Sequence, residues 1–150
     1  MDLTSLLKEA NILLPLTVQN KEECIDKMAD CMAKAGFVTD KISYVETVLN
    51  REKTGSTGIG FGVAIPHGKS RGVAAPGLAF ARLSQPVEWQ SLDGNPVSVV
   101  FLIAVPEENV GNEHLQILIA ISRKLIHEDF RNQLLTAQSP KEVLAILQSL

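Results

Sequence analysis

The chain of 150 residues is 45% hydrophobic and carries a formal net charge of −3. That length and apolar content fit one domain over residues 1–150 with a single core. The weakly negative charge, without a basic cluster, lacks the electrostatic footprint of nucleic-acid binding, so we expect no nucleic acid among the partners. No apolar run approaches the roughly 20 residues that cross a bilayer, and we expect a cytoplasmic protein without membrane insertion.

The chain is predicted to open with a helix, a strand and a second helix. A short helix at residues 3–8 should precede a strand at residues 12–16. Asn20 then has the side chain of a helix cap, and Glu23 completes a capping pattern three residues later. Apolar residues recur at helical spacing from there until Gly36, where the helix should stop.

Two cysteines lie in that second helix. Cys24 and Cys31 are seven residues apart, which places their Cα atoms about 10 Å apart at ~1.5 Å per residue, beyond disulfide reach. We therefore expect free thiols, as is usual in a reducing compartment. The acidic residues beside Cys24 should raise its pKa and make that thiol unreactive.

A third helix should run from about residue 40 to residue 54, with Arg51 and Glu52 in its last exposed turn. Two interpretations of Arg51 remain open. It is either a solvated charge near the helix C-terminus or one part of an anion clamp. In the second case the hydroxyl and N–H groups of Ser56 and Thr57, which follow soon after, would bind the same anion, a phosphate.

The most informative segment of the chain is GSTGIGFGVAIPHGKS at residues 55–70. An apolar, strand-like run ends there at Pro66, and His67 stands between this proline and Gly68. The proline fixes one backbone angle and the glycine removes side-chain bulk, so the imidazole is presented rather than packed. Such a histidine suits nucleophilic or acid–base chemistry, although a structural histidine in a tight turn is the alternative.

Other ligand-binding motifs fail on their spacing. The run at residues 62–70 resembles a Walker A loop, but five residues separate Gly62 from Gly68 where that motif needs four. The glycines at 58, 60 and 62 lack the GxGxxG spacing of a dinucleotide site. The three histidines are scattered, and neither a zinc motif nor GxSxG occurs. We therefore expect no cofactor and no metal.

Two apolar runs at residues 78–83 and 97–105 are predicted strands. Asp93 and Gly94 supply a turn before the second run, which is apolar throughout. A strand of that kind belongs in the centre of a sheet that is covered on both faces. Together with the helices, this predicts an α/β fold: a three-layer sandwich with a mixed β-sheet flanked by helices.

Three helices should close the chain. The first runs from Asn112 to about Ile126, has apolar residues around most of its circumference and should be well buried; the second lies near residues 130–137, and the third is opened by Ser139. His114 falls in the first turn of the first of them. A helix start favours an anion, so His114 either assists anion binding or merely packs over the helix end. His127 is expected to interact with the C-terminus of the same helix.

The segments REKTGSTGIGFGVAIPHG at 51–68, residues 86–107 and EHLQIL at 113–118 resemble the enzyme IIA domain of the fructose/mannitol class of the sugar phosphotransferase system, EIIA type 2. The resemblance implies a phosphoryl carrier: His67 accepts a phosphoryl group from the phosphocarrier protein HPr and passes it to a sugar-specific IIB domain. It also implies that His114 is a second active-site histidine and Arg51 an active-site arginine. The fold implied, a mixed sheet between helices, agrees with the predicted elements.

This resemblance predicts how the site works. A neutral His67 should attack phosphorus through Nε2 while a backbone acceptor fixes its other ring nitrogen. Because the partners are proteins, the site should be shallow and apolar at its rim, with Ile59, Phe61 and Val63 as candidates. A regulatory module, as in the nitrogen-related branch of the family, is the alternative to sugar transport. A histidine-based acid–base enzyme with a small-molecule pocket is a third, unrelated possibility.

Overall fold

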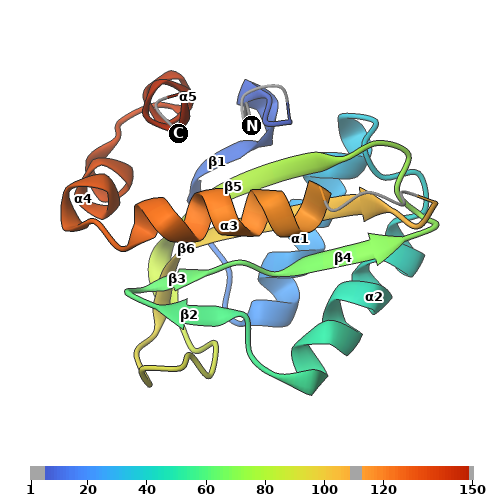
Figure 1. Cartoon of the computed structure of the whole chain (residues 1–150), viewed down its shortest axis with the longest axis horizontal. Helices are drawn as coiled ribbons and strands as arrows, with labels where there is room; N and C mark the ends of the chain where they lie inside the picture. The colour runs from blue at the N-terminus through green and yellow to red at the C-terminus, as the bar shows by residue number, and fades with distance from the viewer. Residues whose placement is uncertain (1–5, 109–112, 149–150) are drawn as a thin grey trace.

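The computed structural model describes residues 6–108 and 113–148, apart from the side chains of residues 113–115. Figure 1 shows a sheet between two layers of helices, which confirms the predicted fold class. The elements are a 3₁₀ turn (Glu9–Asn11), β1 (Ile12–Leu16), α1 (Lys21–Lys34), α2 (Lys41–Thr54), β2 (Gly58–Gly60), β3 (Val63–Ala64), β4 (His67–Ser70), β5 (Gly77–Val87), β6 (Val97–Pro106), α3 (Glu113–Leu125), α4 (Glu128–Thr136) and α5 (Pro140–Leu147).

The described strands form one mixed sheet in the order β1-β5-β6-β3-β2. β5 pairs with β6 in antiparallel fashion, whereas β3 and β4 both lie parallel to β6 on its other side, one after the other. β1 is parallel to β5, and β2 is antiparallel to β3. The long apolar strand β6 therefore lies inside the sheet, and β4 lies beside it.

Both faces of the sheet are covered by helices, as Figure 1 shows for α3 on one face and α1 and α2 on the other. Along β6, Phe101 and Ile103 pack with α3, α4 and α5, while Leu102 and Ala104 pack with α1 and α2. Residues of a strand alternate between the two faces, so an unbroken apolar run is the pattern that two covered faces require.

Helix α2 runs antiparallel to β4 and is tied to both ends of it. Before α2, the N–H of Thr39 donates to the carbonyl of Gly72 at 2.8 Å. After α2, the carbonyl of Thr57 accepts from the N–H of Ile65 at 3.0 Å. The loop that follows α2 is thereby placed next to the start of β4.

The prediction of a helix at residues 3–8 is wrong where the structure describes it. Residues 6–8 are not helical, and a 3₁₀ turn follows at Glu9–Asn11. Leu6 uses its carbonyl to accept from the N–H of Leu78 at 3.0 Å, at the start of β5. That contact with the sheet replaces the local helical hydrogen bond. Residues 3–5 lie outside the described part of the chain.

The expectation that α3 is well buried is also wrong, because only one side of the helix is buried. Ile117, Ile121 and Leu125 face the core, whereas Gln116 is exposed and Ile119 is 42% exposed. These positions follow the spacing of one buried stripe on an amphipathic helix. The helix lies on the sheet with its other side open, so its apolar residues do not all find a neighbour. The proposed cap, Asn112, lies outside the described residues.

Candidate functional site

The apolar run before His67 stops ahead of Pro66 as predicted, because β3 ends at Ala64, but His67 then begins a strand, β4, that was not predicted. β3 and β4 pair one after the other with the same strand, β6, and the segment Ile65-Pro66 separates them. His67 is in register with Ile103, whose side chain packs on the α3 face of the sheet. Its neighbour Gly68 faces α2 instead. The imidazole is therefore half-buried on the α3 face of the sheet.

One ring nitrogen of His67 has a fixed partner. Nδ1 lies 3.1 Å from the carbonyl oxygen of Ile65, two residues earlier. A carbonyl oxygen only accepts, so this contact requires the proton on Nδ1. In a neutral imidazole the lone pair then lies on Nε2. The backbone acceptor predicted for the second ring nitrogen is thus present in the structure.

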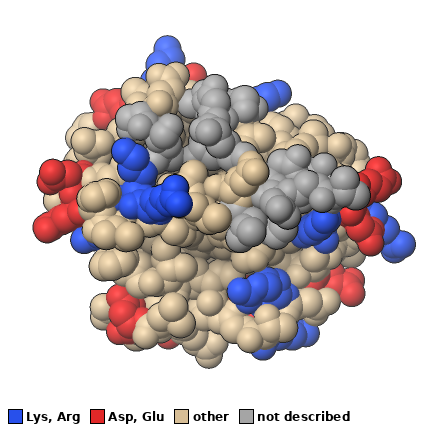
Figure 2. Space-filling view, in the orientation of Figure 1, with Lys and Arg blue, Asp and Glu red and all other residues tan. Residues whose placement is uncertain are grey.

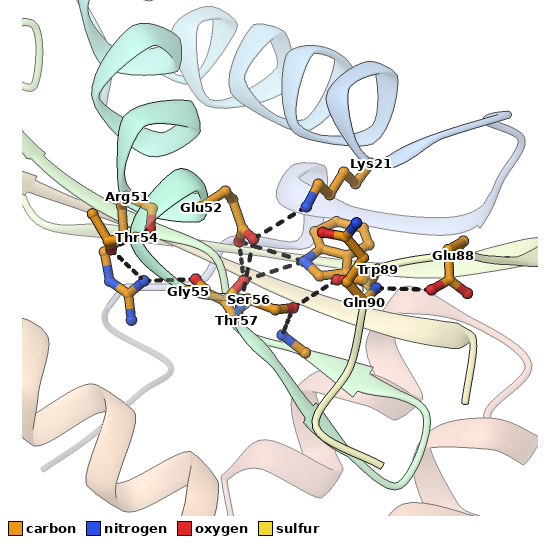
Figure 3. A network of polar contacts seen from close by, with 11 residues as sticks. Lys21, Arg51, Glu52, Thr54, Gly55, Ser56, Thr57, Glu88, Trp89 and Gln90 are labelled. Atoms are coloured by element: carbon orange, nitrogen blue, oxygen red, sulfur yellow. Dashed lines mark hydrogen bonds and ion pairs between the residues drawn. The ribbon is translucent and has the colours of Figure 1, made fainter. Parts of the chain in front are cut away.

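Glu52 is buried, contrary to the prediction of an exposed last turn for α2. Its carboxylate accepts from both the hydroxyl and the N–H of Thr57, and from Nε1 of Trp89 at 3.4 Å. Nζ of Lys21 lies 3.7 Å from the same carboxylate. Figure 3 shows these donors converging on Glu52 from α1, from the loop after α2 and from the segment after β5. A buried carboxylate needs such partners, and none of them is adjacent in sequence.

Arg51 is held at the end of α2. Its Nη1 donates to the carbonyl of Gly55 at 2.8 Å and to the hydroxyl of Thr54 at 3.2 Å (Figure 3). The side chain is half-exposed. The guanidinium thus closes the C-terminal turn of the helix and retains further N–H donors, because it carries five in all.

Ser56 and Thr57 use their hydroxyl groups within the fold. Ser56 donates to the carbonyl of Trp89 at 2.6 Å and accepts from the N–H of Gly58 at 3.0 Å. Thr57 donates to Glu52 and accepts from Nε1 of Trp89 at 3.2 Å. Both hydroxyl protons are therefore already donated to protein acceptors. Binding of phosphate through these hydroxyls, which stays a prediction, would require them to turn away from those acceptors.

The two other histidines lie around α3. The backbone of His114 belongs to the first turn of α3, but its side chain lies outside the described residues. His127 is exposed between α3 and α4. Nη1 of Arg131 donates to the carbonyls of Leu125 and Ile126 at 2.7 and 3.0 Å. The cationic side chain that contacts the C-terminal end of α3 is therefore that of Arg131, whereas the sequence predicted His127 in this place.

The three residues predicted for the apolar rim differ in their exposure to solvent. Phe61 is 56% exposed and Ile59 is half-buried, but Val63 is only 3% exposed and belongs to the core, which corrects that prediction. The guanidinium of Arg131 stacks over the ring of Phe61 at 4.3 Å. Sequence reasoning missed Arg131 because no local pattern links it to residue 61. Acidic side chains lie mainly toward the rim of this face, whereas its middle is largely uncharged with a few Lys and Arg (Figure 2).

Neither the two cysteines nor the potential metal-ligating side chains of the described part form a further site. Burial, and to a smaller extent the Glu23 carboxylate, raises the pKa of Cys24 to about 12, and burial also raises that of Cys31. Both are free thiols, as predicted. Within residues 6–108 and 113–148, no three potential metal-ligating side chains come together, and no helix is long and apolar enough to cross a membrane.

Comparison with known proteins gives a family and close relatives. The family model for the phosphoenolpyruvate-dependent sugar phosphotransferase system, EIIA 2, matches residues 5–150. A fructose-specific EIIABC component from Bacillus subtilis is 42% identical over 147 residues, which make up 98% of this chain and 23% of that protein. A fructose-specific EIIA component from Haloferax volcanii is 41% identical over 127 residues, 85% of this chain and 82% of that protein. The chain thus spans about a quarter of the first relative and most of the second.

Solved structures agree with the fold. The crystal structure of the nitrogen regulatory protein IIA-Ntr from Neisseria meningitidis is 35% identical, with a TM-score of 0.84 and coverage of 96% of this chain and 97% of that one. The complex of enzyme IIAMTL with phosphorylated enzyme IIBMTL from Escherichia coli gives 28% identity and a TM-score of 0.82, with coverage of 97% and 100%.

Proposed function

Because this chain belongs to the EIIA type 2 family of the phosphoenolpyruvate-dependent sugar phosphotransferase system, we propose that it carries a phosphoryl group on Nε2 of His67. The observation that supports this most directly is the contact between Nδ1 and the carbonyl of Ile65, which leaves the lone pair on Nε2. A neutral imidazole with a lone pair on the attacking nitrogen is the nucleophile that phosphoryl transfer between histidines needs.

The transfer itself is a displacement at phosphorus. A bond forms between Nε2 of His67 and the phosphorus while the nitrogen–phosphorus bond of the donor phosphohistidine breaks, and that electron pair returns to the donor imidazole. The proton on Nδ1 stays donated to Ile65 throughout. Arg51 and His114 are proposed to stabilise the charge that spreads over the transferring group, each charge-assisted hydrogen bond contributing about 1.5–3 kcal/mol.

The proposed donor is the phosphocarrier protein HPr and the proposed acceptor is a sugar-specific IIB domain, in the cytoplasm beside a membrane permease. The similar mannitol enzyme IIA was solved with phosphorylated IIB. The site also suits protein partners, because the half-buried His67 lies on the α3 side of the sheet and Phe61 is exposed in the hairpin that precedes it. The identity to fructose-specific relatives favours a fructose-type permease.

A regulatory role is the second candidate. It is favoured by the similarity to the nitrogen regulatory protein IIA-Ntr, which this chain matches over 97% of that chain with a TM-score of 0.84. In such a role the phosphorylation state of His67 would control contacts with other proteins. The chemistry at His67 would be the same, and only the partner that follows would differ.

Phosphorylation by the upstream proteins tests the shared chemistry. Incubation with phosphoenolpyruvate, enzyme I and HPr should label this chain once, with an acid-labile and base-stable bond. His67→Ala should reduce the label below detection, because the variant lacks the imidazole that is proposed to accept the phosphoryl group. His127→Ala is the matched control, since His127 is exposed just after the C-terminal end of α3. This variant should keep full labelling. A label that persists in His67→Ala would refute the proposal.

A further inference from the structure

We propose that Thr57 and Glu52 are positioning residues for His67 and that they act through the backbone of Ile65. They hold the imidazole ring in the tautomer that has its proton on Nδ1 and its lone pair on Nε2. The kinetic part of this inference rests on the proposed function, whereas the part that concerns the ring does not. The argument follows one chain of contacts from the buried carboxylate to the imidazole.

Both backbone polar groups of Ile65 make hydrogen bonds that hold this residue in place. Its N–H donates to the carbonyl of Thr57 at 3.0 Å, and its carbonyl accepts from Nδ1 of His67 at 3.1 Å. Pro66 follows, which restricts the backbone of Ile65 further, and the carbonyl of Pro66 accepts from the N–H of Ile103 at 3.0 Å. The direction of the Ile65 carbonyl, and with it the His67 ring, therefore depends on where Thr57 lies.

Thr57 is fixed in turn by Glu52. Thr57 is 5% and Glu52 7% exposed. The carboxylate accepts from two groups of Thr57, its N–H at 3.4 Å and its hydroxyl. Nε1 of Trp89 lies 3.2 Å from the Thr57 hydroxyl, and Lys21 balances the charge at 3.7 Å. If the Thr57 hydroxyl is removed, the buried carboxylate of Glu52 loses a donor and must rearrange to recover one. Because the N–H of residue 57 donates to the same carboxylate, that rearrangement should shift the backbone of residue 57.

The chemical consequence falls on the tautomer of His67. If the Thr57 carbonyl shifts, the Ile65 peptide can rotate and its carbonyl no longer holds the Nδ1 proton. The ring then populates the form with the proton on Nε2, which has no lone pair on the attacking nitrogen. Misplacement of an attacking group is costly even when the group is intact. The loss should appear in the rate of phosphoryl transfer.

Thr57→Val tests this, because it keeps the shape of the side chain and removes the hydroxyl. The ring nitrogens of His67 are observed by ¹⁵N NMR in the absence of any phosphoryl donor, and the rate of phosphorylation by phospho-HPr is measured separately. We expect a larger share of the Nε2–H form and a rate about tenfold lower, the effect of one lost hydrogen bond to a charged group. Thr57→Ser should return both readouts to within about twofold of the natural protein.

Thr39→Val is the matched control, since Thr39 also donates its hydroxyl to a backbone carbonyl, that of Gly72 at 3.3 Å, but at the far end of β4. It should change neither readout. An unchanged tautomer in Thr57→Val would overturn the proposal, and so would an equal change in Thr39→Val. A slower rate with an unchanged tautomer would assign Thr57 to direct phosphate binding instead.

Trp89→Phe removes a donor from the same cluster without altering Thr57, and it serves if Thr57→Val does not fold. It should shift the tautomer in the same direction, and the absence of a shift would overturn the proposal. Because the NMR measurement needs no phosphoryl transfer, it remains decisive even if His67 proves not to carry phosphate. Failure of the proposed function would appear instead as persistent labelling of His67→Ala.

Discussion

Gly68 is required at its position for a reason of size. A Cβ placed there would lie 2.8 Å from Cγ2 of Val48 and 3.3 Å from Cε1 of Tyr44, both on α2. The absence of a side chain lets the helix approach the strand next to His67. Tyr44 completes this contact, because its hydroxyl donates to the carbonyl of Ile103 at 2.7 Å. The residue that follows His67 is thus determined by packing against α2.

Gly68→Ala should lower the free energy of unfolding by about 1–3 kcal/mol, the usual cost of overpacking a close contact. Urea unfolding measures this. Gly55→Ala is the control, since a Cβ at Gly55 would meet no atom within 4 Å, and its effect should stay within about 0.5 kcal/mol. Equal losses in the two variants would show that α2 does not approach the strand as closely as the structure indicates.

At the scale of elements, the hairpin of β2 and β3 depends on a carboxylate from elsewhere in the chain. Phe61 lies at its tip with φ of 61°, and its N–H donates to Oδ2 of Asp93 at 3.1 Å. Asp93 also accepts from the N–H of Asn95 at 3.0 Å. These N–H donors, that of Asn95 foremost, lower the pKa of Asp93 below its ordinary 3.8. The carboxylate therefore joins the hairpin to the loop before β6.

This carboxylate gives a pH dependence with a definite sign. Because folding lowers its pKa, the stabilisation is complete above pH 3.8 and is lost as the pH falls through the lower folded value. The amide resonance of Phe61 should therefore titrate with an apparent pKa below 3.8. In Asp93→Asn that titration should vanish. A midpoint at or above 3.8 in the natural protein would contradict the contact.

At the scale of the whole molecule, the sequence predicted the elements whose signals are local. The caps Asn20 and Ser139 each accept the expected N–H, because a cap needs only its own first turn. β6 was identified as central because both of its faces are apolar. The fold class followed from such patterns, whereas the helix at residues 3–8 was predicted wrongly and the short strands β2 and β4 were not predicted.

The misjudged features depend on distant partners. Glu52 looked like an exposed helix-end charge because the indole that binds it lies 37 residues further on. The sequence does not predict the strand that begins at His67, because Pro66 interrupts the local pattern and the strand forms only by pairing with Ile103. Arg131 reaches Phe61 from α4. Propensity and spacing carry no information on contacts of that range, so these contacts could be found only in the structure.

The choice between transport and regulation also belongs to the whole molecule, because partner selection sums small contacts over an interface. Identity is 41–42% to the fructose-specific relatives and 28% to the mannitol enzyme. We therefore expect the phosphorylated chain to transfer to a fructose-type IIB domain at least about tenfold faster than to a mannitol-type one, a difference of about 1.4 kcal/mol. Rapid mixing with purified IIB domains measures both rates, and His67→Ala, which should carry no phosphoryl group, gives the background. Equally slow transfer to every IIB domain would instead favour regulation, in which the phosphoryl group marks a state and is not passed on to a sugar.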